Sequence, residues 1–319
     1  MKKLIFNTWS GAYFKPGGGE VQLESSKKHL EMIGYSIERF NQWCPQYDFD
    51  IFHQFSVANG VEHSLLSYKE AGKKIVLSTI LWDDFPKDSW DYQRIKLLFD
   101  NSDLLFTNSD LESKRLSRAF ETPIKKFHKT RNSIAATYQT KGDPTLFRKK
   151  FSIDGDFVLS VANIDKRKNT KSLVEACDYL GKKLVLIGHI RDIEYYNSFR
   201  DKYSNFIYLG SITNQNLLKS AYKACRVFAL PSFCETPGLA ALEAASQGAS
   251  IVITQEGAAP EYLPDAIFTN PYDNEDLIEA ITKGWEREPN LKECNELVSN
   301  FSWENTAKDI ALGYEKLFL

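Results

Sequence analysis

Short apolar runs alternate with helical patterns along the whole chain. Runs such as "KLIFNTW" at 3–9 and "KKIVLSTIL" at 73–81 predict buried strands, because their apolar residues are nearly continuous. The segments between such runs repeat their apolar residues at helical spacing. A second series of the same kind begins with "DFVLSVAN" at 156–163. The pattern therefore predicts an α/β protein with parallel, doubly wound sheets.

The positions of the predicted elements suggest two similar halves. The predicted strands lie at 3–9, 49–55, 73–81, 104–109, 156–163, 182–189, 205–210, 226–232 and 250–254. The predicted helices lie at 21–33, 62–72, 92–103, 110–120, 170–181, 195–204, 214–225, 274–288 and 300–319, with Asp110 as the N-cap of the fourth. A further helix is predicted inside 236–248, as explained below.

The chain length of 319 residues also favours two domains. Gly142, Asp143 and Pro144 interrupt the pattern within 139–151. We therefore expect a first Rossmann-like domain over 1–145, a second over 146–300, and a final helix over 301–319. Open parallel sheets bind ligands at the carboxyl ends of their strands, so a cleft between the two domains is the expected site.

The stretch "FCETPGLAALEAASQG" at 233–248 combines a strand end with a helix start. Thr236 is expected as the N-cap and Pro237 as the first helical residue, where its missing N–H costs nothing. The N–H groups of Gly238 and Leu239 would then point out of the helix without partners. Together with the helix dipole they form an anion site suited to a phosphate.

Two glutamates bracket this anion site. Glu243 lies five residues after Gly238, or ~7.5 Å along a helix, which is roughly the length of a diphosphate. A carboxylate at that distance can accept both hydroxyls of a ribose. Glu235 precedes the helix, on the side where a donor sugar would lie. A nucleotide-sugar accounts for both carboxylates, whereas simple solvation of the two is the alternative.

Two cations follow the first strand of the second half. Arg167 and Lys168 lie in "DKRKN" at 165–169, on a loop where an anionic leaving group needs positive charge. The alternative is an ordinary solvated basic loop.

The segment "ETPGLAALEAASQGASIVITQEGAAPEYL" resembles the E-x7-E signature of retaining glycosyltransferases with the GT-B fold, most closely those of family 4. The resemblance extends over the C-terminal half and is looser in the N-terminal half. It implies that Glu243 holds the ribose, that Glu235 contacts the donor sugar, and that Arg167 and Lys168 neutralise the diphosphate. It also implies that the last helix crosses back onto the N-terminal domain.

The resemblance implies weaker assignments as well. Gly210 and Ile212 would line the nucleobase pocket, and Gly18 in "KPGGGE" would let the backbone approach phosphate or acceptor. An ordinary flexible turn is the alternative for the glycine run.

The N-terminal half departs from the pattern of this family. Ile80 stands where many members carry a histidine, and Asp83 and Asp84 directly after it are candidates for that polar role. His53 is a second candidate on the acceptor side, with a buried structural histidine as the alternative.

Composition limits the partners and the compartment. The net charge of −2 and pI of about 6.3 do not favour nucleic acid. Five cysteines without a C-x-x-C pair favour a reducing cytoplasm. No apolar run reaches the ~18 residues of a membrane span. The basic cluster at 124–131 is either a solvated face or a peripheral contact with the inner face of the plasma membrane.

We therefore expect a retaining glycosyltransferase that moves a sugar from a nucleotide-diphosphate donor to a saccharide or lipid-linked acceptor, with no metal or other cofactor. Bacterial surface polysaccharide synthesis is what the resemblance implies. Two alternatives stay open, a nucleotide-sugar 2-epimerase and a catalytically inactive nucleotide-sugar-binding subunit.

Overall fold

The computed structural model describes residues 2–14, 16–83, 85–288 and 300–319. It divides into two compact units. The first unit comprises Met1–Asn132 and Trp303–Leu319, and the second unit comprises Ser133–Ser302. The division falls before the segment 139–151, where the sequence predicts a linker. Part of that segment forms a helix of the second unit, α5 (Pro144–Phe151).

The first unit is built around a six-stranded parallel sheet in the order β2-β1-β3-β4-β5-β6. The strands are β1 (Lys3–Asn7), β2 (Ser36–Arg39), β3 (Ile51–Phe55), β4 (Lys74–Ser78), β5 (Leu104–Thr107) and β6 (Phe127–Lys129). The helices are η1 (Ala12–Phe14), α1 (Gly18–Met32), α2 (Glu62–Glu70), α3 (Trp90–Asn101), α4 (Asp110–Ala119), η2 (Ile124–Lys126), α13 (Trp303–Glu315) and η5 (Lys316–Phe318).

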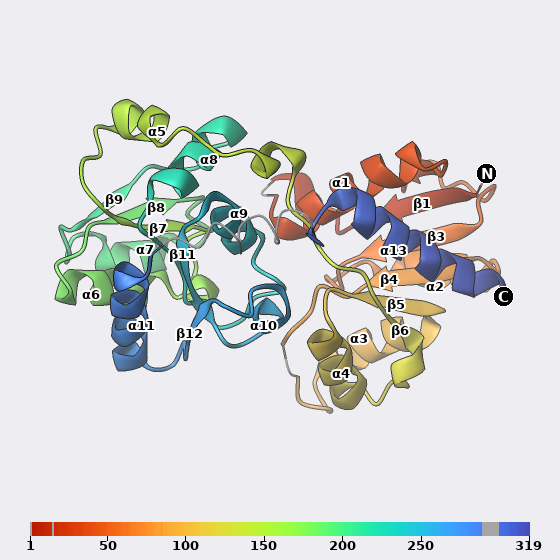
Figure 1. Cartoon of the computed structure of the whole chain (residues 1–319). Helices are drawn as coiled ribbons and strands as arrows, with labels where there is room; N and C mark the ends of the chain where they lie inside the picture. Colours follow the sequence, from red (N-terminus) through yellow and green to blue (C-terminus); the bar gives the residue numbers. More distant parts are fainter. Residues whose placement is uncertain (1, 15, 84, 289–299) are drawn as a thin grey trace. The chain divides into compact units, whose positions relative to one another are not determined.

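Helices cover both faces of this sheet. Apolar residues of α2, α3 and α4 form one core with the strands, and those of α1 and α13 form a second core on the opposite face. Ile310 and Tyr314 of α13 are buried there, and Leu317 is partly buried against them. Figure 1 shows α13 running beside α1, although the two are far apart in the sequence. The predicted return of the last helix to the N-terminal unit is therefore confirmed.

The second unit contains another six-stranded parallel sheet, in the order β12-β11-β10-β7-β8-β9. Its strands are β7 (Val158–Val161), β8 (Leu184–Ile187), β9 (Phe206–Tyr208), β10 (Val227–Leu230), β11 (Ser250–Thr254) and β12 (Ile267–Thr269). In addition to α5 its helices are η3 (Ala136–Gln139), η4 (Lys166–Lys168), α6 (Thr170–Tyr179), α7 (Ile193–Arg200), α8 (Gln215–Ala224), α9 (Leu239–Gln247), α10 (Ala259–Tyr262) and α11 (Asn274–Glu286).

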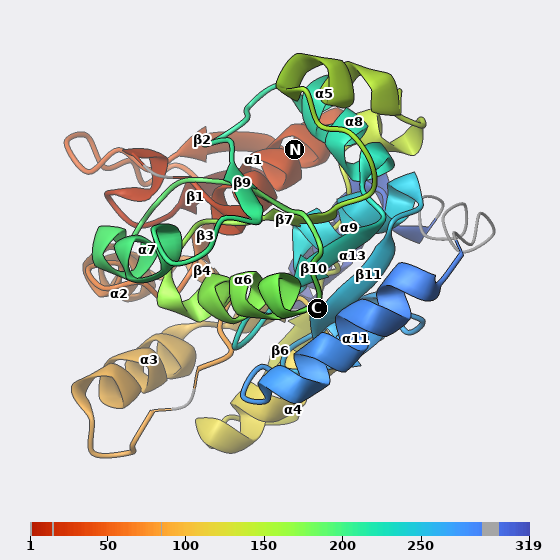
Figure 2. The ribbon, with the colours of Figure 1, turned by 90° about the vertical axis from the view of Figure 1, so that its left-hand side faces the viewer.

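This second sheet also has a core on each face. Helices α5, α8, α9 and α10 contribute to one core, and α6, α7 and α11 contribute to the other. Figure 2 shows α6 and α11 next to each other on one side of the sheet. The predicted fold class, two doubly wound parallel α/β units, is confirmed.

The sequence missed three of the four edge strands, and predicted the fourth, β9, at 205–210. β2 and β6 are the two edges of the first sheet, and β12 is one edge of the second. β2 and β6, with the sequences SIER and FHK, carry charged or polar residues because one side of an edge strand faces water, so they produce no apolar run. The N-cap of α4 was also predicted wrongly. Ser109, not Asp110, caps the helix, since its side chain accepts a hydrogen bond from Glu112 N.

Candidate functional site

The strand order of the second sheet defines a switch point between β7 and β10. Chain connections leave in opposite directions from this pair, so the loops after the two strands separate at their carboxyl ends. Such a gap is where open α/β sheets bind their ligands. The two loops at this place carry residues 162–169 and 231–238. They include five of the site residues predicted from the sequence: Arg167, Lys168, Glu235, Thr236 and Gly238.

The loop after β7 is held in a defined shape. Asp165 Oδ1 accepts a hydrogen bond from Lys168 N at 3.1 Å, and the turn η4 ends at Asn169, which has a φ of 51°. Asn169 Nδ2 donates to Pro271 O at 2.9 Å. Phe233 N donates to Arg167 O at 2.9 Å, which joins this loop to the loop after β10. These hydrogen bonds therefore fix the backbone of the loop after β7 and tie the loop after β10 to it.

Lys168 and Glu235 form a buried ion pair across the two loops. Lys168 Nζ lies 2.5 Å from Glu235 Oε1, and only 13% and 6% of the two side chains are exposed. Ser232 Oγ donates to the same carboxylate oxygen at 2.5 Å. The structure thus brings the two predicted residues together, and Glu235 determines where the ammonium group of Lys168 lies.

Arg167 lies beside this pair and is more exposed. Burial of its guanidinium opposes the charge, but attraction to Glu235, Cys234 and Asp165 outweighs burial and raises the pKa of Arg167. The group therefore carries a permanent positive charge at the carboxyl edge of the sheet.

Helix α9 begins later than the sequence predicts. Gly238, with a φ of 85°, is the N-cap, and no side chain caps the helix. The expected capping by Thr236 is therefore wrong, and Thr236 and Pro237 lie in the loop, joined by a cis peptide bond. A left-handed backbone before the helix suits glycine, which has no Cβ to clash. Gly248 ends the helix, as predicted.

The start of α9 lies close to the ion pair. A Cβ placed on Gly238 would be 3.6 Å from Glu235 Oε2. The first amides of a helix lack intrahelical partners, and the helix dipole is positive at this end. The amides of Gly238 and Leu239 therefore combine with Lys168 and Arg167 in one positive region.

Glu243 lies inside α9 and is held by two tyrosines. Tyr222 Oη of α8 donates to Glu243 Oε2 at 2.8 Å, and the hydroxyl of Tyr138 also hydrogen-bonds to this carboxylate. Burial raises the pKa of Glu243 to about 7, although these hydrogen bonds oppose the rise. Sequence reasoning missed both tyrosines, because only the packing of η3 and α8 against α9 brings them to Glu243.

The whole of this site lies within a stretch that matches a known family. Residues 144–300 match the model of the family described as Glycosyl transferases group 1. This part of the chain belongs to the group 1 glycosyltransferases. The match contains both glutamates, both cations and all of α9.

Named relatives of this chain agree with the family match. The serotype-specific mannosyltransferase WbdA of Escherichia coli is 30% identical over 186 residues, which are 53% of this chain and 23% of WbdA. The O-antigen chain mannosyltransferase B of Escherichia coli is 26% identical over 253 residues, which are 73% of this chain and 66% of that protein. The chain thus spans about a quarter of the length of WbdA.

Solved structures show the fold. Sucrose-phosphate synthase from Thermosynechococcus elongatus superposes with a TM-score of 0.81 over 99% of this chain and 98% of that chain, at 16% identity. Anabaena Alr3699/HepE in complex with UDP gives a TM-score of 0.79 over 99% of this chain and 100% of that chain, also at 16% identity. The chain therefore has the GT-B fold that the resemblance implied.

Two further residues that the sequence predicted for the site, Gly210 and Ile212, lie at the same edge of the second sheet. Gly210 and Ile212 are in the loop between β9 and α8. Gly210 has a φ of 71°, and its carbonyl accepts a hydrogen bond from Gly188 N at 2.9 Å. Ile212 is partly buried against the core formed by α8 and α9. Their part in a nucleobase pocket stays a prediction.

His53 belongs to the core of the first unit. It is 0% exposed, and its ring nitrogens hydrogen-bond to Tyr314 Oη at 2.6 Å and Ser78 Oγ at 2.8 Å. Burial lowers the pKa of His53 to about 3, so the ring is neutral. The suggestion that His53 contacts the acceptor is therefore wrong, and the structural alternative holds.

The remaining candidates of the first unit are separate from that core. Gly18 is the first residue of α1, after the N-cap Gly17. Asp83 is exposed, and Asp84 lies outside the described residues. Ile80, at the expected histidine position, has a φ of 45°, a conformation that is costly for a β-branched residue.

The turn at Ile80 is supported by a buried carboxylate that the sequence did not reveal. Glu112 accepts hydrogen bonds from Thr79 Oγ1 at 2.6 Å and from Leu81 N at 3.3 Å, on either side of Ile80. Burial raises the pKa of Glu112 to about 7, against the effect of these bonds.

Three general features concern metals, membranes and thiols. Among the described residues, histidine, cysteine and acidic side chains form no group that could hold a metal ion. In the same part of the chain, no helix combines the length and apolarity needed to cross a membrane. Cys44, Cys177, Cys225 and Cys234 form no disulfide bond with one another, and Cys294 lies outside the described residues.

Proposed function

We propose that this protein is a retaining glycosyltransferase that transfers a hexosyl group from a nucleotide-diphosphate-sugar to a saccharide acceptor. The observation that carries the proposal is the positive region at the β7–β10 switch point. There the ion pair of Lys168 and Glu235, the guanidinium of Arg167 and the start of α9 lie together, one helical turn and a half from Glu243.

The diphosphate of the donor binds at the start of α9. The amides of Gly238 and Leu239 donate to its oxygens, and Arg167 supplies a positive charge. Lys168 supplies a fixed one, because Glu235 and the capped turn hold its side chain and backbone. Electrostatic groups that are fixed in advance stabilise a developing charge without reorganisation during the reaction.

The ribose binds at Glu243. An ionised carboxylate accepts hydrogen bonds from two hydroxyls, and such bonds favour the ionised form. Burial raises the pKa of Glu243 to about 7 in the free site. Hydrogen bonds from the ribose hydroxyls then lower this pKa, because they stabilise the ionised carboxylate. The nucleotide and the proton therefore compete for Glu243.

The transfer step retains the anomeric configuration. The bond between the anomeric carbon and the diphosphate oxygen breaks, and the acceptor oxygen bonds to the same face of that carbon. The acceptor hydroxyl loses its proton to the departing phosphate oxygen. Lys168, Arg167 and the α9 amides stabilise the negative charge on the leaving group, while Glu235 lies on the side of the donor sugar.

The donor and acceptor classes follow from the relatives. The related proteins of Escherichia coli are named as mannosyltransferases, one of them for O-antigen chains, and a structural relative binds UDP-glucose. We therefore propose a UDP- or GDP-linked hexose as donor and a growing surface polysaccharide, free or lipid-linked, as acceptor, with the reaction on the cytoplasmic side of the membrane. Two cations already face the phosphates, so we propose that no metal is required.

A panel of donors tests the proposal. The protein is incubated with UDP-, GDP- and dTDP-hexoses, with and without α-linked mannobiose, and products are followed by NMR. Slow donor hydrolysis that becomes transfer with retained configuration supports a retaining transferase. A new epimer of the donor would identify an epimerase, and tight binding without turnover would identify a binding subunit. Loss of turnover in EDTA with recovery in Mg²⁺ would contradict metal independence.

A further inference from the structure

A pocket of about 690 Å³ lies wholly within the first unit. The loop after β1, the loop after β2 and the beginning of α2 form its walls, with lining residues between Phe6 and Tyr68. β1 and β3 are neighbours in a sheet ordered β2-β1-β3, so the pocket lies at the switch point of the first sheet. Its volume is within the range of small-molecule sites, and no residue of the second unit contributes to it.

Aromatic side chains make up a third of the residues that line the pocket. They are Phe6, Trp9, Tyr13, Phe40, Trp43, Tyr47 and Tyr68. Trp43 is 87% exposed and Tyr47 is 54% exposed, so both side chains are open to solvent and to a ligand. The ring of Tyr47 meets the edge of the buried Tyr68 at 5.5 Å between centroids, which anchors it to the core. Exposed aromatic faces in a concave site are typical of ligand-binding surfaces.

The position of the Trp9 indole depends on Gly11, two residues further along the chain. A Cβ placed on Gly11 would lie 2.3 Å from the indole Cζ3 of Trp9, which is shorter than any real contact. Because the indole ring is rigid, a side chain at position 11 would displace it. Gly11 therefore allows Trp9 to lie where it lines the pocket.

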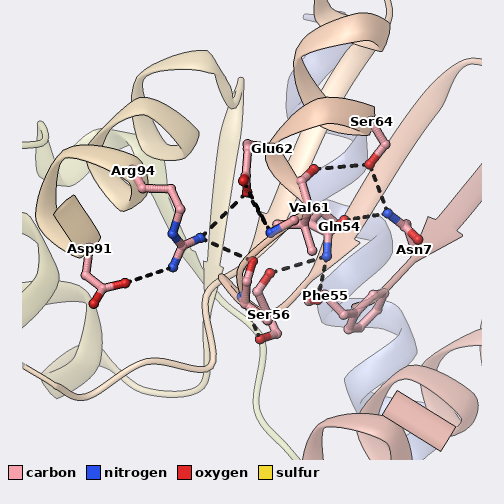
Figure 3. Close-up of polar contacts among 11 residues, drawn as sticks. Asn7, Gln54, Phe55, Ser56, Val61, Glu62, Ser64, Asp91 and Arg94 are labelled. Carbon is pink, nitrogen blue, oxygen red and sulfur yellow. Dashed lines mark hydrogen bonds and ion pairs between the residues drawn. The ribbon is translucent and has the colours of Figure 1, made fainter. Parts of the chain in front are cut away.

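The polar lining is uncharged for the most part. Asn7 Nδ2 donates to Gln54 Oε1 at 2.9 Å and to Ser64 Oγ at 3.1 Å, and these two bonds fix the orientation of its amide (Figure 3). Asn41, Gln42 and Asn59 add exposed amides. Amides both donate and accept hydrogen bonds, as a ligand rich in hydroxyls requires.

Arg94 and Glu62 hold the loop that carries Asn59. Arg94 Nη1 donates to Ala58 O at 3.1 Å, and Glu62 Oε2 accepts from Gly60 N at 3.0 Å (Figure 3). Arg94 also lies 3.8 Å from Glu62, which connects the two contacts. This loop of the pocket is therefore held in place before a ligand binds.

The charges argue against a phosphate ligand. Among the described residues that line the pocket, Arg39 is the permanent cation, and it is engaged by Glu24 Oε1 at 2.6 Å and lies over the ring of Tyr13. Phosphate sites instead present arginine or lysine groups to the anion. A neutral ligand with apolar faces and many hydroxyls fits these side chains.

We propose that this pocket binds a neutral oligosaccharide, with the apolar face of one sugar ring against Trp43 and its hydroxyls on the amides around it. The proposal deepens the proposed function, on which it rests, because the oligosaccharide is then the sugar portion of the acceptor. The pocket recognises sugar residues of the acceptor chain and is separate from the nucleotide site, which lies in the other unit.

Binding to the full chain tests this proposal. α-Linked mannotriose and maltotriose are titrated by calorimetry and by saturation-transfer NMR, with UDP and GDP as separate probes of the second unit. Trp43→Ala is expected to weaken trisaccharide binding about tenfold, and Trp43→Phe to restore most of it. Gly11→Ala is expected to weaken it as well. Tyr179→Ala, at a residue 77% exposed on α6, is the control and leaves trisaccharide binding unchanged.

The outcomes separate the pocket from the proposed function. Weaker trisaccharide binding in Trp43→Ala, with the nucleotide affinity of the wild type, supports the pocket. The support stands even if no sugar transfer is detected, in which case only the proposed function fails. Equal binding by wild type and Trp43→Ala, or no binding of either trisaccharide at millimolar concentration, would overturn the proposal. Binding of inorganic phosphate in place of the trisaccharides would overturn it too.

Discussion

The ion pair of Lys168 and Glu235 provides a quantitative test of the candidate site. Both side chains are largely buried, and Glu235 Oε1 receives hydrogen bonds from Lys168 and Ser232. Glu235→Ala removes the carboxylate and leaves the ammonium group of Lys168 buried without its partner. Lys168→Met removes the other charge, and the double variant removes both.

The expected loss of stability follows from burial. Removing one partner of a buried pair costs about 3–5 kcal/mol, because the remaining charge is uncompensated. For a unit of this size, a loss of 1 kcal/mol lowers Tm by about 2–4 °C, so Glu235→Ala lowers Tm by roughly 6–20 °C. The double variant regains most of this loss, since no charge remains to be paired.

Thermal unfolding of the four proteins followed by circular dichroism measures this coupling. The same samples are titrated with UDP and GDP, and each single variant is expected to bind nucleotide more weakly than the wild type. The reasoning would be refuted if Glu235→Ala unfolded within 1–2 °C of the wild type, or if the losses of the single variants simply added in the double variant.

Three further predictions concern single side chains. Nucleotide affinity is expected to fall about tenfold per unit as the pH is lowered below 7, because burial raises the pKa of Glu243 to about 7 and only the ionised form accepts the ribose hydroxyls; a titration of Glu243→Gln that keeps the same slope would contradict this. Gly238→Ala is expected to lose about 1–2 kcal/mol of stability and to weaken nucleotide binding. Gly181 also has a positive φ, of 61°, and serves as the control, so Gly181→Ala is expected to lose stability without a change in nucleotide binding. Equal nucleotide affinities of the two variants would exclude the role of Gly238. His53→Ala is expected to lose about 2 kcal/mol or more in denaturant unfolding without changing nucleotide affinity, since His53 is a core residue; a stable variant with altered nucleotide binding would disprove this.

The central strands and most helices were predictable from the sequence, because burial on both faces leaves continuous apolar runs. β10 (Val227–Leu230) and β11 (Ser250–Thr254) are fully buried and were both found. β2 and β6 were not found, because an edge strand shares its polar residues with an ordinary loop. Local pattern alone therefore identified the middle of each sheet and only one of the four edge strands, β9.

The site was predictable where it depends on one short segment. The helix with Glu243 and its glycine end at Gly248 follow from residues 233–248 alone. The start of α9 was missed, because a Thr-Pro pair is a common helix start and the left-handed Gly238 takes its place only in the folded loop.

Contacts between distant segments could not be predicted. Glu235 reaches Lys168 across two strands, and Tyr138 reaches Glu243 from the segment before α5. His53 was predicted as a possible acceptor contact because it lies at the end of a strand. It is instead a buried residue that contacts Tyr314 of the last helix, and the local sequence does not show this contact. Such contacts depend on the packing of whole helices.

A crystal structure of the protein with UDP or GDP bound tests the central claim most directly. The account predicts that the diphosphate lies within hydrogen-bond distance of the Gly238 and Leu239 amides and of Arg167 or Lys168, and that the ribose hydroxyls lie on Glu243. A nucleotide bound elsewhere, or one whose ribose does not contact Glu243, would contradict it.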